Sequence, residues 1–81
     1  MRKEVGEELQ DPKVVERVRF VRLSLGLTRP EFAQKTGVAL RALEAWDAGH
    51  THPSLKSIRK IAIATNRPVA WFLGLEEEVA A

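Results

Sequence analysis

Apolar positions recur along this chain at helical spacing, and no stretch shows the period of two that a half-buried β-strand requires. The clearest stripe, with spacings of four, three and four, consists of Val14, Val18, Val21 and Leu25. Asp11 followed by Pro12 is typical of an N-cap and a first helical residue. The pattern predicts a first helix that starts near residue 12 and is ended by Gly26.

Two short helices are predicted next, over 29–36 and 40–48. Thr28 is a good N-cap, and Glu31 three positions later completes a capping box. Gly37 can adopt the left-handed conformation that ends a helix. Small residues at the turn let the two helices approach closely at a steep angle. This is the pattern of a helix-turn-helix, whose second helix can lie in a DNA major groove. An αα-hairpin without a nucleic-acid role is the alternative.

A fourth and a fifth helix complete an all-α chain of five helices. Ser54 is expected to cap the fourth, and its core-facing positions are Leu55, Ile58, Ile61, Ala62 and Thr65. Residues 66–68 break it, and a short helix over 69–73 ends at Gly74. The sequence predicts one compact domain with the helix-turn-helix at helices two and three.

Composition narrows the function classes. Eighty-one residues are enough for one small domain, and no cysteine is present for a disulfide or a thiolate metal site. The two histidines, one residue apart, lack a third ligand, so we expect no metal and no cofactor. No catalytic constellation is evident, which argues against an enzyme. No membrane span or signal peptide is apparent, and the expected location is the cytoplasm.

Charge is distributed unevenly along the chain. An N-terminal extension over 1–12 and an acidic C-terminal tail over 76–81 flank the domain expected at 13–75. The domain carries eleven Lys or Arg against four acidic residues, a balance of +7. Such a basic body favours a polyanionic partner, although a solvated charged surface is the alternative.

Some apolar residues do not fit the inward faces of their helices. On a helical wheel these outward residues are Phe20, Leu23, Trp71 and Leu75. Large apolar side chains on the surface of a small domain require a cover. The N-terminal segment could supply it through Val5 and Leu9, or a second subunit could, in a homodimer.

From Arg17 to Gly74 the chain resembles the helix-turn-helix domain of the phage repressor/Cro-like (XRE) family. The residues that carry the resemblance are Leu27-Thr28, Glu31-Phe32-Ala33, Gly37-Val38, Leu43, Trp46-Asp47, Gly49, Pro53-Ser54 and the run from Pro68 to Gly74. The resemblance covers 58 of 81 residues. It implies a five-helix, sequence-specific regulator of double-stranded DNA, typically a dimeric repressor.

Carried over by position, the third helix is the recognition helix. The base-reading positions are Ala39, Leu40, Arg41, Ala42, Glu44 and Ala45. Only Arg41 and Glu44 can hydrogen-bond base edges, Arg41 with guanine and Glu44 with cytosine. The alternative for this pair is an i,i+3 surface ion pair. Ala39 and Leu40 stand where the family commonly has polar residues, which weakens direct readout.

The resemblance also implies phosphate contacts on both sides of the recognition helix. These positions are Thr28, Arg29, His50, Thr51, His52 and Ser54. For the histidines the alternative is an exposed polar loop. Asp47, which is not a phosphate candidate, stands where the family has a Glu, and we interpret it as a structural contact at a helix end rather than as a catalytic carboxylate.

A second class of function stays open. The same fold could serve as a protein-interaction module, such as an antitoxin, an anti-repressor or a docking regulator, with a protein partner on Phe20 and Leu23 or on Trp71 and Leu75. The few polar residues in the third helix favour this alternative, whereas Arg29, Arg41 and the basic body favour DNA.

Overall fold

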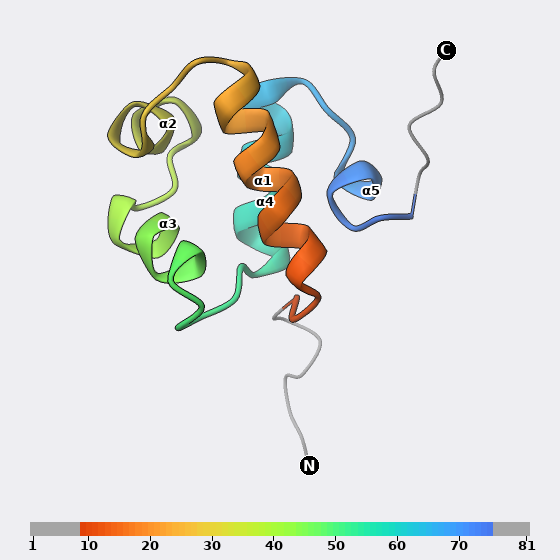
Figure 1. Cartoon of the computed structure of the whole chain (residues 1–81). Coiled ribbons are helices and arrows are strands. Elements are labelled where there is room, and N and C mark those ends of the chain that lie inside the picture. The colour runs from red at the N-terminus through yellow and green to blue at the C-terminus, as the bar shows by residue number, and fades with distance from the viewer. Residues whose placement is uncertain (1–8, 76–81) are drawn as a thin grey trace.

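Five α-helices surround one core in a computed structural model that describes residues 9–75. The helices are α1 (Pro12–Ser24), α2 (Arg29–Thr36), α3 (Leu40–Asp47), α4 (Leu55–Thr65) and α5 (Val69–Phe72), and no strand occurs within this range. The predicted all-α, five-helix class is confirmed. In Figure 1, α1 crosses the front of the molecule with α4 behind it, α2 and α3 on one side and α5 on the other.

The helix boundaries follow from the capping residues identified in the sequence. The Asp11 side chain accepts a hydrogen bond from the Lys13 backbone N–H, with Pro12 in the first turn. At α2, the Thr28 hydroxyl accepts from the Glu31 N–H while the Glu31 carboxylate accepts from the Thr28 N–H, so the capping box is complete. The first orphan N–H groups of both helices are thereby satisfied, which sets where each helix starts.

The core lies where α4 meets α2 and α5, and where α5 meets α1. Its fully buried large side chains are Phe32, Phe72, Ile58, Ile61 and Pro53. The predicted face of α1 is buried at Val14, Val18 and Val21. Leu25 was expected on the same face but is 46% exposed; as the C-cap it still donates to the Val21 carbonyl, and it lies just beyond the last residue of α1.

The expectation that Trp71 is exposed on the surface is wrong. The wheel placed it outward, yet only 7% of its surface is exposed. The single turn of α5 contacts both α1 and α4, so two of its sides are covered rather than one. By contrast Phe20, Leu23 and Leu75 are exposed as expected, Phe20 to 56%.

The N-terminal segment contributes to the fold through Leu9. Its backbone N–H donates to the Pro53 carbonyl at 2.9 Å, and its side chain packs against the core. Leu9 does not cover Phe20, which stays exposed. Val5, the other residue expected to cover it, lies outside the described residues, because residues 1–8 and 76–81 are not described. None of the helices in the described range is both long enough and apolar enough to span a bilayer.

Candidate nucleic-acid interface

The turn between α2 and α3 is held by its own backbone and by one buried hydroxyl. Gly37 has a φ of 82°, in the left-handed region that a side chain would disfavour. The Thr36 hydroxyl donates to the Phe32 carbonyl at 2.8 Å and accepts from the Val38 N–H at 3.2 Å. Both Thr36 and Val38 are buried. The angle between the two helices is therefore set by a turn that is hydrogen-bonded and packed against the core.

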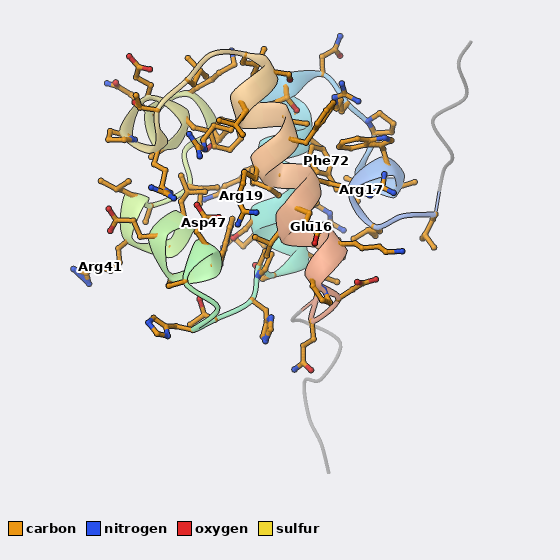
Figure 2. All side chains as sticks on the ribbon, in the orientation of Figure 1. Glu16, Arg17, Arg19, Arg41, Asp47 and Phe72 are labelled. Atoms are coloured by element: carbon orange, nitrogen blue, oxygen red, sulfur yellow. The ribbon has the colours of Figure 1, made fainter. Side chains whose placement is uncertain are left out.

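Helix α3 presents one face to the core and the opposite face to solvent. Leu43 and Trp46 are buried, whereas Arg41 and Glu44 are exposed. Figure 2 shows Arg41 projecting away from the body of the protein. Both salt bridges formed within residues 9–75 involve Asp47, so the alternative of an Arg41–Glu44 ion pair is not realised. These two side chains are free to meet an external ligand.

The other expected base-reading positions differ in how much of each residue is exposed to solvent. Ala39 is exposed, and Leu40 and Ala45 are half-buried. Ala42 is half-buried and packs against the core, so it belongs to the rim of the packed face rather than to the outer face. Ala48 is exposed directly after the helix and was missed. It lies seven residues after Arg41, a helical spacing that could have identified it from the sequence.

Asp47 joins the three helices that build the interface. Its Oδ1 accepts from Arg19 of α1 at 3.1 Å, and its Oδ2 accepts from Arg29 of α2 at 2.5 Å. Figure 2 shows Arg19 and Asp47 pointing toward one another between α1 and α3. The Asp47 side chain is only 17% exposed, and charge-assisted bonds in such a setting are stronger than those at a fully solvated surface. Asp47 therefore makes a structural contact at the end of α3, as interpreted from the sequence.

The same contact changes the interpretation of Arg29. Its guanidinium was expected to contact a DNA phosphate, but its Nε–H donates a hydrogen bond to Asp47. Within the described chain its two terminal nitrogens make no hydrogen bond, so they retain donors for an external anion. The ion pair joins the start of α2 to the end of α3. Arg29 therefore combines a structural contact with a position beside the candidate reading face.

The remaining phosphate candidates differ in how free their side chains are. His50, Thr51 and His52 are exposed in the loop after α3. Thr28 is exposed, and its hydroxyl oxygen accepts the cap bond while its O–H stays available. Ser54 is half-buried, and its hydroxyl both donates to Ser57 Oγ and accepts from the Ser57 N–H, so its side chain is already used as a cap.

One further basic residue that could contact a phosphate was not identified in the sequence analysis. Lys56 lies in the first turn of α4, close in sequence to the loop of residues 50–53, and its side chain is exposed. A basic residue just after a capping serine was the available signal. Among residues 9–75, no group of three His, Cys, Asp or Glu side chains is placed to hold a metal ion.

Comparison with known proteins agrees with this geometry. The family model HTH_3, described as helix-turn-helix, matches residues 18–72. The crystal structure of an HTH_3 family transcriptional regulator from Vibrio cholerae superposes with a TM-score of 0.70 at 24% identity. The match covers 82% of this chain but only 36% of that protein, so this chain spans about a third of its length. No curated protein has a significantly similar sequence.

Proposed function

The chain belongs to the helix-turn-helix family HTH_3, and we propose that it is a sequence-specific, double-stranded-DNA-binding transcriptional regulator of the repressor type. The observation that carries the proposal is the outer face of α3, where Arg41 and Glu44 are exposed and unpaired within the described chain. The solved relative from Vibrio cholerae, itself named a transcriptional regulator, supports the same assignment. We assign the protein no catalytic role and place its action in the cytoplasm.

In the proposed complex α3 lies in the major groove. Arg41 pairs with guanine O6 and N7, and Glu44 accepts from cytosine N4. Leu40 and Ala45 offer thymine methyl groups an apolar surface. The N-terminus of α2, with the terminal nitrogens of Arg29, and the loop of residues 50–52 meet phosphates on either side.

Direct readout by one such helix is limited. A bidentate Arg–guanine pair supplies about 1–3 kcal/mol of discrimination, whereas specific sites exceed random DNA by about 4–10 kcal/mol. Two half-sites read together would supply much of the difference. We therefore propose that the protein acts as a homodimer on a two-fold site with half-sites about 34–36 Å apart.

The exposed apolar residues Phe20, Leu23 and Leu75 are the proposed dimer contacts; Trp71, being buried, supports this surface from below. Sedimentation at tens of micromolar, with and without DNA, is expected to show a dimer in at least one condition. Phe20→Ser should weaken the dimer, while Ile63→Ser, at a still more exposed apolar position on α4, should not. A monomer in both conditions would remove the basis for two-fold recognition.

Binding is expected to weaken steeply with salt. If each subunit neutralises about three phosphates, counterion release gives a dimer a slope near −5 in a plot of log affinity against log salt. Gel-shift titrations at several salt concentrations, with random and genomic DNA, measure both the slope and the preference among sequences. A slope near zero would mean that the basic surface does not contact DNA.

A protein-interaction module is the second candidate. It is favoured by the exposed Phe20 and Leu23 on α1, and by an α3 surface with only two side chains able to read bases. The same titration separates the two candidates, because a pure interaction module would bind genomic and random DNA equally weakly.

A further inference from the structure

An open groove of about 780 Å³ lies between α1 and α5, apart from the candidate DNA interface. Its lining residues are Lys13, Glu16, Arg17, Phe20, Arg67 and Trp71. In Figure 1, α5 and α3 flank α1 on opposite sides, and Figure 2 shows Arg17 next to α5 and far from Arg41. The groove is thus separate from the α3 surface, and readout by α3 does not account for it; it adjoins the proposed dimer contacts through Phe20.

The groove is positively charged. Lys13, Arg17 and Arg67 face a single acidic residue, Glu16. Both salt bridges within residues 9–75 are made by Asp47, so none of these cations is neutralised there. Such a concentration of charge attracts a carboxylate-rich segment.

Trp71 brings two of these cations together. The guanidinium carbon of Arg67 lies 4.4 Å from the indole centroid and that of Arg17 lies 5.0 Å from it. Arg17 also donates to the Trp71 carbonyl at 3.1 Å. Stacking orients both planar groups but leaves most of their N–H donors available. Two adjacent guanidinium groups repel each other, and an anion between or beside them would relieve that repulsion.

The sequence that follows α5 carries a matching set of negative charges. Residues 76–78, outside the described range, are three consecutive glutamates. They follow Leu75, whose N–H donates to the Ala70 carbonyl at 2.9 Å, so the residue before this segment is held to α5. Three extended residues span about 10 Å, and Leu75 is only four residues after Trp71, against which both guanidinium groups lie, so the loop to be closed is short and costs little entropy.

We propose that the acidic segment Glu76–Glu78 docks into the basic α1–α5 groove of its own subunit. Its carboxylates neutralise Arg17, Arg67 and Lys13, so that this face does not attract nucleic acid or other polyanions and the basic surface around α3 is left as the one that does. The proposal concerns a separate surface and does not depend on DNA binding by α3.

The test compares two charge-matched variants of the full chain without DNA. E76Q/E77Q/E78Q removes the acidic segment, and E4Q/E7Q/E8Q removes three glutamates near the other end. In ¹H–¹⁵N spectra the first variant is expected to shift the Trp71 indole N–H, with the Trp46 indole as internal control. At low salt its Tm should fall by about 2–5 °C, as expected for a few surface ion pairs in a domain of this size. The second variant should do neither.

Two further measurements make the result specific. In about 1 M salt, where the screening length is about 3 Å, the wild-type Trp71 signal should move to the position of E76Q/E77Q/E78Q. On an R67Q background the effect of removing the glutamates should fall by at least half. An unmoved Trp71 signal, or equal shifts in both glutamate variants, would overturn the proposal. The difference in Trp71 position between the wild type and E76Q/E77Q/E78Q should persist on 20-fold dilution; a difference that disappears would also overturn the proposal, because a neighbouring copy would then supply the segment.

Discussion

Replacing Phe32 with alanine is expected to lower the free energy of unfolding by about 3–5 kcal/mol, the usual cost of removing a buried aromatic ring. Phe32 has no exposed surface, it lies on α2 where that helix packs against α4, and its carbonyl accepts the Thr36 hydroxyl at the turn. Since native domains are stable by only about 5–15 kcal/mol, the loss removes a large share of the total. Thermal unfolding followed by far-UV circular dichroism should show a Tm lower by more than about 12 °C.

Ile63→Ala is the matched control for this prediction. Ile63 is a large apolar residue of α4 that is 82% exposed, so its truncation should change stability by less than about 0.5 kcal/mol. DNA binding by the Phe32 variant should fail at temperatures where the control still binds, because α2 positions α3. Equal stability of the two variants would contradict the core described above.

Arg41→Ala is expected to weaken binding to the preferred DNA site by about 1–3 kcal/mol, or about 5- to 150-fold, and to flatten the ranking of sequences. The reason is that Arg41 is the one exposed guanidinium on the outer face of α3. Binding to random DNA should change little by comparison. Competition gel shifts with a set of site variants measure both quantities.

Arg41→Lys provides the control, because lysine keeps the charge but not the bidentate geometry. It should bind random DNA like the wild type and still lose most of the preference for guanine at one position. Arg29→Ala is expected to weaken all sequences by a similar factor, but Arg29 also binds Asp47, so its effect includes a change in how α2 and α3 are held. If Arg41→Ala leaves the ranking intact, α3 is not the reader and the interaction-module alternative gains.

Local chemistry explains why the helix boundaries could be predicted from the sequence. Caps act over three or four residues, so Asp11, Thr28 with Glu31, and Ser54 each satisfy the orphan N–H groups of the helix that follows. Gly37 ends α2 through its own backbone conformation. These determinants need no tertiary partner, and the predicted starts of α1, α2 and α4 are confirmed.

The outward positions of α3 were assigned from the family resemblance, and helical periodicity explains why Arg41 and Glu44 are exposed. Arg41 and Glu44 lie opposite Leu43 and Trp46, and the structure exposes the first pair and buries the second. Periodicity could not decide Ala42, which lies at the edge of the two faces. Its half-burial depends on how closely the core approaches that edge.

Only the tertiary structure revealed the bonding partners of Asp47 and the burial of Trp71. Asp47 accepts hydrogen bonds from Arg19 and Arg29, which precede it in the sequence by 28 and 18 positions. The Trp71 carbonyl accepts from Arg17, which precedes it by 54 positions. A helical wheel treats each helix as having one covered side, but α5 contacts both α1 and α4. The sequence by itself therefore determined the helices, their caps and the family resemblance, because these depend on near neighbours. The ion pairs that brace the interface and the cations around Trp71 depend on helix packing, and only the packed structure reveals them.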